Sequence, residues 1–358
     1  MKKLLCMLIA CTLVFATGIC AGAQDRGYVI ADASLSDSGV DAADALQALI
    51  DGNPNRTIFL PDGVYLLSRP LCTPADPQKS VDLQLSRYAV LRAAPNFEGE
   101  ALVRLGGKDA ANDTHTPGSN YSLTGGVLDC SGLTGGVTIE SGRETAVREV
   151  SIKNAIIGLH IFFGANSGSS DADVRSLNII GTGGRESVGI LVDGYDNTFT
   201  DIRIGYVFQG VVLRGGGNVL RNVHPLYYSD YTDYEESCGF YDESGSNLYD
   251  YCYSDQFCNG FWTTVDNPNV YTDCFCFWYS AAGGRETAFR ADGRFQSNVT
   301  NTRISFRGDT VNTVLKTPRF FGKGTFDGLI VERKRVHDHS YLRFVRGSFW
   351  WWINQLFG

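Results

Sequence analysis

The sequence contains little of what helical, membrane-spanning or nucleic-acid-binding proteins need. Only 2 Met and 10 Pro occur among 358 residues, and stretches with the spacing of an amphipathic helix are scarce. Beyond residues 1–23, no segment is long and apolar enough to span a bilayer. Positive charge is not in excess either, because the formal net charge is −8. This charge argues against a nucleic acid or an anionic membrane surface as the partner.

The first 23 residues have the parts of a secretory signal. Lys2 and Lys3 give a basic start, residues 4–16 are apolar, and Ala21-Gly22-Ala23 offers small residues for cleavage. We expect cleavage after Ala23 and a secreted or periplasmic protein.

An odd number of cysteines remains after this signal, so at least one is unpaired within the chain. Cys252 and Cys274 fall at the same position of neighbouring repeats. Buried stacked thiols fit this position best, with a disulfide between the two as the alternative. No metal site is expected, since the single residue between Cys274 and Cys276 fits zinc spacing poorly. No cofactor is expected, and no motif supports calcium. The seven cysteines are Cys72, Cys130, Cys238, Cys252, Cys258, Cys274 and Cys276.

A short pattern returns four times after residue 150: a Gly, two apolar residues, a polar turn and an Asn. It runs from Gly189 to Asn197, Gly210 to Asn218, Gly239 to Asn247 and Gly260 to Asn269. Successive Asn residues are 21, 29 and 22 positions apart. A period in the low twenties with alternating apolar positions is typical of a solenoid made of strands. We predict an all-β chain, a right-handed parallel β-helix over residues 53–335, because parallel crossovers are right-handed.

Residues 24–52 are expected to cap this solenoid. A helix over Asp41–Asp51 places Ala45, Leu46, Leu49 and Ile50 on one face. It would cover the open first coil, since an exposed strand edge invites aggregation. A strand pair, Thr57–Leu60 and Gly63–Leu67, is expected around the turn formed by Pro61-Asp62-Gly63.

The segments Ala42–Asp51 (AADALQALID) and Arg56–Leu67 (RTIFLPDGVYLL) resemble the opening of the pectate-lyase superfamily, in particular its rhamnogalacturonase- and epimerase-like branch. The resemblance extends through the repeats and covers most of the chain. It implies a right-handed parallel β-helix. It specifies activity poorly, because that superfamily contains lyases, hydrolases, epimerases and phage tailspike domains.

Alternation within each repeat predicts which side chains point outward. Positions two, five and seven after the Asn should point inward, and positions four and six outward. Matching positions of stacked coils then form ladders, about 4.8 Å per step. The Asn residues themselves are interpreted as structural, because Asn tolerates left-handed turns and stacked amides hydrogen-bond to one another. The outward positions are Asp201, Arg203, Asn222, His224, Tyr251, Tyr253, Asp273 and Phe275.

Two clusters of chemically active side chains fall on these coils. Asp230 and Asp255 end the repeated phrase Tyr-Ser-Asp, and stacking would pair them for acid/base work on a glycosidic bond. The alternative is a solvated turn. His224 lies at an outward position near Arg203 and Tyr253. These three side chains would suit β-elimination from a uronic acid. The alternative is that they are exposed and lie together by coincidence. We predict as catalytic Asp230, Asp255, His224 and Tyr253. We predict as substrate-binding Arg203, Asp273, Arg285, Tyr228 and Trp278.

Two enzyme types of this superfamily carry motifs that this sequence lacks. Polygalacturonase-type hydrolases carry acids and a Gly-His-Gly motif in successive coils, whereas the comparable position here reads Cys258-Asn259-Gly260. The calcium-binding aspartates and catalytic arginine of calcium-dependent pectate lyases find no match. Our first hypothesis is an exported enzyme, a lyase or glycoside hydrolase, acting on a pectin-like or other complex glycan. The second is a non-catalytic carbohydrate-binding or adhesion solenoid.

The C-terminal segment, residues 336–358, is strongly apolar around Phe349-Trp350-Trp351-Trp352. It is too short to span a bilayer. We expect it to cover the last coil or to contact another chain, since so apolar a patch is seldom left exposed.

Overall fold

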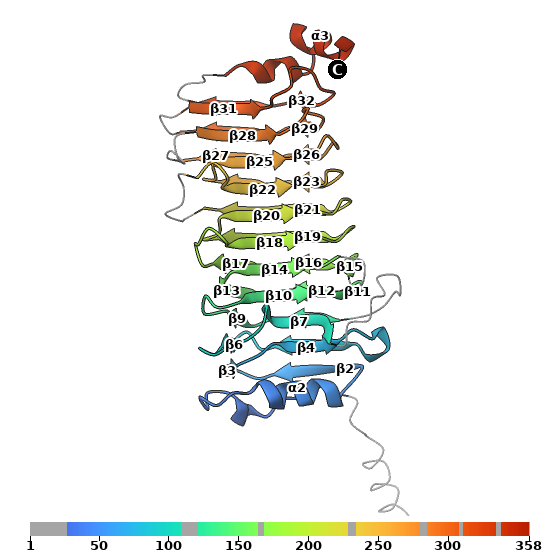
Figure 1. Cartoon of the computed structure of the whole chain (residues 1–358), viewed down its shortest axis with the longest axis vertical. Helices are drawn as coiled ribbons and strands as arrows, with labels where there is room; N and C mark the ends of the chain where they lie inside the picture. The colour runs from blue at the N-terminus through green and yellow to red at the C-terminus, as the bar shows by residue number, and fades with distance from the viewer. Residues whose placement is uncertain are drawn as a thin grey trace, which may run out of the picture.

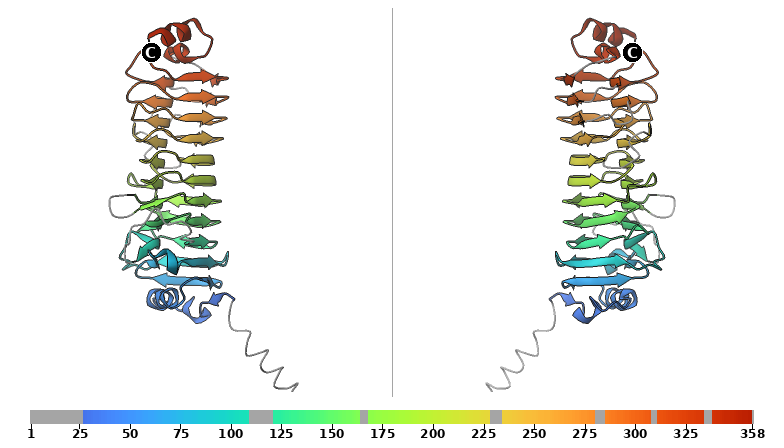
Figure 2. Two further views of the ribbon diagram at one scale, coloured as in Figure 1. Left: turned by 90° about the vertical axis from the view of Figure 1, so that its right-hand side faces the viewer. Right: turned by 90° about the vertical axis from the view of Figure 1, so that its left-hand side faces the viewer.

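The computed structural model describes residues 27–108, 121–163, 168–227, 234–279, 285–307, 311–333 and 338–357. These residues form a right-handed parallel β-helix, an elongated molecule in which each turn of the chain adds one rung (Figure 1). Side views show the strands stacked one above another between two end caps (Figure 2). The all-β solenoid predicted from the repeat is confirmed.

Three stacks of parallel strands run along the molecule. The first stack consists of β1 (Val29–Ile30), β2 (Arg56–Leu60), β5 (Val81–Leu85), β8 (Ser122–Thr124), β12 (Ala146–Arg148), β16 (Asp173–Arg175), the first halves of β19 (Thr198–Gly205) and β21 (Val219–Leu226), β23 (Leu248–Asp250), β26 (Val270–Thr272), β29 (Asn298–Thr300) and β32 (Thr325–Asp327). The second stack consists of β3 (Gly63–Leu67), β6 (Ala89–Ala93), β9 (Val127–Asp129), β13 (Ser151–Ala155), β17 (Asn178–Gly181), the second halves of β19 and β21, β24 (Tyr253–Asp255), β27 (Phe275–Trp278), β30 (Arg303–Phe306) and β33 (Ile330–Arg333).

The third stack is a separate ten-stranded sheet. It consists of β4 (Leu71–Pro74), β7 (Ala101–Lys108), β10 (Gly135–Ile139), β14 (Ile157–Ile161), β18 (Val188–Val192), β20 (Gln209–Leu213), β22 (Cys238–Asp242), β25 (Asn259–Thr263), β28 (Arg285–Ala291) and β31 (Val311–Lys316). A short pair, β11 (Ser141–Arg143) and β15 (Gly168–Ser170), lies beside it.

A single left-handed residue separates the first stack from the second in successive coils. Asp201, Asn222, Tyr251, Asp273 and Asn301 have φ values of 57°, 52°, 55°, 53° and 48°. Asp and Asn adopt this conformation readily, because their short polar side chains hydrogen-bond locally. The chain therefore bends at the same place in each coil, and the residue after the bend points into the core.

The expected alternation of inward and outward side chains is confirmed. The inward positions Phe199, Ile202, Tyr249 and Tyr271 are buried, whereas the outward positions are half-buried or exposed. Aromatic rings stack along the interior, with 4.7 Å between the centroids of Tyr249 and Tyr271. Like side chains thus stack on one another from rung to rung in the core.

The asparagine ladder is present. Of the two reasons expected for it, the hydrogen bonding of stacked amides is confirmed, whereas the left-handed conformation of the Asn residues is not. Asn197 Nδ2 donates to Asn218 Oδ1 at 2.9 Å, and Asn218 Nδ2 donates to Asn247 Oδ1 at 3.2 Å. The backbone N–H of each Asn donates to the next side chain as well. The left-handed residue is not the Asn but the residue before it, as at Asp196 with φ 60°.

The cysteines described are all free thiols. Cys252 and Cys274 are buried, and each sulfur contacts backbone carbonyl oxygens rather than a second sulfur. The stacked-thiol interpretation therefore holds and the disulfide alternative is wrong in this structure.

The N-terminal cap is helix α2 (Ala43–Gly52), preceded by the 3-10 turn η1 (Ala33–Leu35). Leu46 and Ile50 are buried as expected, but Ala45 is exposed and Gln47 is buried instead. Gln47 exchanges two hydrogen bonds with the backbone of Cys72, which fixes the helix on the first coil. The expected strands β2 and β3 form, yet they do not pair with each other, because each pairs with the next coil.

The other end is closed by the 3-10 turn η3 (Ser340–Phe344) and helix α3 (Phe349–Phe357), which lies at the top of Figure 1. Phe344 is buried and packs against Phe295 with 5.1 Å between centroids. A further 3-10 turn, η2 (Pro77–Lys79), lies between β4 and β5. Strand pairing begins at Val29, inside the segment expected to be cap alone.

Candidate functional site

Five outward side chains follow one another on the second stack, one per coil, and we call them the cleft ladder. In order they are Arg203, His224, Tyr253, Phe275 and Arg303. Arg203 pairs in register with His224, Tyr253 with Phe275, and Phe275 with Arg303. The ladder thus starts and ends on a cation with three rings between.

The rings of the cleft ladder stack directly on one another. The centroids of His224 and Tyr253 are 4.0 Å apart with planes at 13°, and those of Tyr253 and Phe275 are 4.7 Å apart. The Arg303 guanidinium lies 5.5 Å from the Phe275 centroid and is held by Glu332 at 2.7 Å. Among the described residues Arg203 makes no ion pair, and its Nη1 has only long contacts of 3.4 Å to carbonyl oxygens. Arg203 is therefore the cation available to a ligand.

The cleft ladder forms one wall of a cleft of about 560 Å³. The other wall is made by the left-handed bend residues Asn222, Tyr251, Asp273 and Asn301. The cleft exists because the chain bends at these residues, so two rows of side chains diverge from the backbone. Its volume lies within the range of about 300–1,000 Å³ that is typical of ligand sites.

Asp255 lies behind the ladder and does not line the cleft. The Tyr253 hydroxyl donates to Asp255 Oδ2 at 3.2 Å, and His224 Nε2 lies 3.8 Å from the same oxygen. The side chains of His224 and Asp255 are 18% and 15% exposed. Within the described residues His224 Nε2 is buried without a hydrogen-bond partner.

The structure brings together five of the residues predicted from the sequence: His224, Tyr253, Asp255, Arg203 and Asp273. Trp278 does not join them, because its ring is fully buried and its Nε1 donates to the Phe257 carbonyl at 2.6 Å. Its prediction as a substrate-binding residue is wrong, since even positions of β27 point inward. Tyr228 and Asp230 lie outside the described residues, as does the side chain of Arg285.

Sequence reasoning missed two residues of the cleft, Arg303 and Asn301. Both fall beyond Asn269, where the repeat loses its Asn and a Ser takes that place, with Ser297 Oγ accepting from the Asn269 N–H. The signal was present, because Asn301 and Arg303 continue the outward positions of Asp273 and Phe275 by 28 residues.

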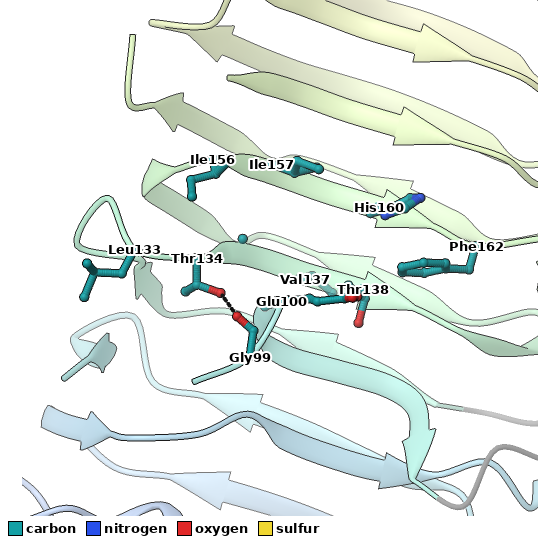
Figure 3. A pocket seen from close by; sticks show the side chains of 12 residues that line it. Gly99, Glu100, Leu133, Thr134, Val137, Thr138, Ile156, Ile157, His160 and Phe162 are labelled. Carbon is teal, nitrogen blue, oxygen red and sulfur yellow. Dashed lines mark hydrogen bonds between the residues drawn. The ribbon is translucent and has the colours of Figure 1, made fainter. Parts of the chain in front are cut away.

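A second cavity, of about 360 Å³, lies on the outer face of the third stack and shares no lining residue with the cleft (Figure 3). Leu133 and Ile156 stand at one end of it, and His160 and Phe162 at the other.

Among the described residues no helix is long and apolar enough to cross a membrane. In the same part of the chain, no three His, Cys, Asp or Glu side chains gather closely enough to hold a metal ion.

No protein-family model matches the sequence, and no curated protein matches it. Solved structures do match. An endo-xylogalacturonan hydrolase from Aspergillus tubingensis superposes with a TM-score of 0.60 at 13% identity, over 87% of this chain and 95% of that one. The chain therefore has the pectin-lyase-like right-handed β-helix fold.

Two phage tailspikes share the fold. A double mutant of the tailspike of E. coli bacteriophage HK620 matches with a TM-score of 0.56 at 12% identity, over 87% of this chain and 68% of that one. The tailspike gp49 of Acinetobacter baumannii bacteriophage Fri1, a capsular polysaccharide depolymerase, matches with a TM-score of 0.55 at 11% identity, over 88% of this chain and 64% of that one. The chain thus spans about two thirds of each tailspike.

Proposed function

We propose that this protein binds an acidic polysaccharide in the cleft and cleaves it by β-elimination next to a uronic acid. The observation that carries the proposal is the stacking of Arg203, His224 and Tyr253 on successive rungs, with Asp255 behind them. A cation, a base and a hydroxyl acid in one row supply the three groups that elimination needs.

The order of the ladder follows the order of the reacting atoms. A uronate carboxylate held by Arg203 would place the neighbouring C5–H one rung further, at His224, because rungs are about 4.8 Å apart. His224 takes the C5 proton, the C–H electron pair forms the C4–C5 double bond, and the C4–O bond breaks. Tyr253 gives its proton to the departing oxygen. The products are an unsaturated uronate and a new reducing end, so no water is consumed.

Arg203 and Asp255 have supporting roles in this reaction. A guanidinium pairs with a carboxylate through two parallel hydrogen bonds, which withdraws charge and makes the C5 proton more acidic. Asp255, 3.8 Å from His224 Nε2, stabilises the imidazolium that forms when the proton is taken. In this proposal Asp255 is a positioning residue. The sequence instead suggested that Asp255 and Asp230 together perform acid/base catalysis. Asp230 stays a prediction and is included in the test.

Elimination fits the cleft better than hydrolysis does. Glycoside hydrolysis needs two carboxyl groups flanking the bond, about 5–10 Å apart. Among the described residues that line the cleft, Asp273 is the one carboxylate. A glycan substrate is further supported by two proteins of the same fold, since one is a xylogalacturonan hydrolase and the other a capsular polysaccharide depolymerase. The signal-like residues 1–23 support export to where such glycans occur.

The test is a screen of polyuronates and neutral polysaccharides, followed by single variants on the active glycan. We expect ultraviolet-absorbing products from a polyuronate. His224→Ala and Tyr253→Phe should each lower kcat by two or more orders of magnitude, as loss of acid/base groups does. Arg203→Ala should raise KM and also lower kcat, because the substrate carboxylate loses its partner and the C5 proton becomes less acidic.

The matched control is His339→Ala, which removes an exposed imidazole at the far cap. It should leave turnover unchanged. Asp230→Asn, assayed beside it, decides whether that carboxylate contributes. Reducing ends without ultraviolet absorbance would overturn elimination, and binding without any product would favour the non-catalytic solenoid.

A further inference from the structure

The second cavity, on the third stack, is built by strands β7, β10 and β14 (Figure 3). It is hollow because small residues stand where the following coils carry larger ones. Gly135 pairs with Ala101, whereas in the next coils Ile157 pairs with Val188. A Cβ atom on Gly135 would lie 2.7 Å from the Glu100 carbonyl oxygen, so no side chain fits there.

The polar donors around this cavity are already engaged. The Thr134 hydroxyl donates to the Gly99 carbonyl at 2.8 Å, as the dashed line in Figure 3 shows. The Thr138 hydroxyl donates to Glu140 at 2.6 Å. Arg104, the register neighbour of Thr138, is held by Glu140 through two contacts of 2.6 Å. The Thr134 and Thr138 hydroxyl protons are thus engaged, and Arg104 does not line the cavity.

His160 completes the pattern. Its Nε2 lies 2.8 Å from Asp193 Oδ2. Burial raises the pKa of Asp193, but the contacts with His160 and Arg214 outweigh burial and lower that pKa below its ordinary value. Asp193 is therefore ionised and accepts a hydrogen bond from His160 Nε2. The hydroxyl oxygens of Thr134 and Thr138, whose protons are already engaged, are thus acceptors for a ligand.

From this set of acceptors we infer that the cavity is a second glycan site, which binds a single neutral pyranose. The sugar hydroxyls supply the donors that the cavity lacks. The aliphatic side chains Leu133, Ile156 and Ile157, with the Phe162 ring, suit the C–H face of the sugar. Glu100, which lines the cavity, disfavours an anionic sugar. The preference is opposite to that of the cleft, where Arg203 favours an acid.

The experiment compares two probes that differ only at C6: methyl glucoside and its acid, methyl glucuronoside. Binding is followed by saturation-transfer NMR on the full chain carrying Arg203→Ala, which removes the cleft's unpaired cation. We expect transfer to methyl glucoside and at least tenfold less to the acid. Thr138→Val should weaken the glucoside signal about fivefold, as loss of one hydrogen bond does.

The matched control is Thr264→Val, the same change on the same face of the solenoid away from the cavity, which should keep the signal. If Thr138→Val fails to fold, Leu133→Lys tests the half-exposed rim and should also reduce the signal. Equal transfer to both sugars, no transfer at all, or an unchanged signal in the cavity variants would overturn the inference. Because the cavity variants are compared in one Arg203→Ala background, a change in their signal reports on the cavity and does not depend on the proposed elimination.

Discussion

Asp242 is the residue on which the central coils depend most. It is 1% exposed, yet it occupies a register position that belongs to Leu213 one coil earlier. Its carboxylate accepts from the Tyr249 hydroxyl at 2.7 Å and from the side-chain amides of Asn247 and Asn269 at 3.0 and 2.9 Å. A buried carboxylate is tolerated only when donors surround it in this way.

Asp242→Leu should therefore destabilise the protein although it restores the apolar residue of the neighbouring coil. It leaves the buried Tyr249 hydroxyl and the Gly245 N–H without their acceptor, and we expect a loss of about 3–5 kcal/mol in unfolding free energy. Calorimetry should show a large fall in Tm. The control Asp250→Ala breaks an exposed ion pair with Arg221 and should cost less than about 1 kcal/mol. Equal effects of the two changes would contradict this role for Asp242.

Buried thiols make the fold sensitive to alkali. Burial raises the pKa of Cys258 to about 11 and that of Cys274 to about 12, against an ordinary value near 9. Above pH 9 the unfolded chain then loses protons that the folded chain keeps. This part of the stability is present below pH 9 and is lost as the pH rises through 9 to 12.

We predict that Tm falls between pH 8 and 9.5, before tyrosines titrate. Cys274→Val, compared with the unmodified chain, should reduce the slope of Tm against pH. A pH-independent Tm over this interval would contradict the buried, free state of these thiols.

At the level of elements, the asparagine ladder links the coils along the axis. Asn218→Ala removes acceptors for the side chain and backbone of Asn197 and a donor to the Gly215 carbonyl at 2.7 Å. We expect a loss on the order of 1–2 kcal/mol for Asn218→Ala, and more for Asn247→Ala, which also leaves Asp242 short of a donor. Asn298→Ala, on an exposed position, should be nearly neutral. Unchanged thermal midpoints for both ladder variants would refute this.

The strands could be predicted because each coil repeats the pattern of apolar and polar residues of the coil before it. Period and alternation located the inward residues, and hence His224, Tyr253 and Arg203 on one outer face. Trp278 lies two positions beyond the inward Cys276, so the alternation places it in the core, and its prediction as a substrate-binding residue did not follow that rule. Asp242 was missed because its donors come from two coils, Asn247 and Tyr249 from its own and Asn269 from the next, and no single repeat shows that they converge.

For the whole molecule, the two ends differ. Each cap helix buries an amide that exchanges two hydrogen bonds with the backbone, Gln47 of α2 with Cys72 and Asn354 of α3 with Gly322, but α2 also buries Leu46 and Ile50 on the first coil. Three aromatic side chains of α3 face outward, with Phe349 70%, Trp352 60% and Phe357 67% exposed. The predicted cover of the last coil is thus present, with an apolar outer surface that proteins seldom leave bare.

We therefore expect copies of the chain to associate through α3. Changing Trp350, Trp352 and Leu356 together to Ser should shift the sedimentation coefficient to that of a monomer, because the exposed apolar area is lost. Tm should change little, since Asn354 and Phe344 still hold the cap. Deletion of residues 348–358 should alter the oligomeric state or the solubility. An unmodified chain that is monomeric at high concentration would count against this role.

The central claim is that the cleft ladder performs elimination. The direct measurement is mass spectrometry of the products formed from a polyuronate in water enriched in heavy oxygen. The account predicts unsaturated oligosaccharides that contain no heavy oxygen, and none of these products with His224→Ala. Heavy oxygen at the new reducing ends, or an intact polymer, would contradict it.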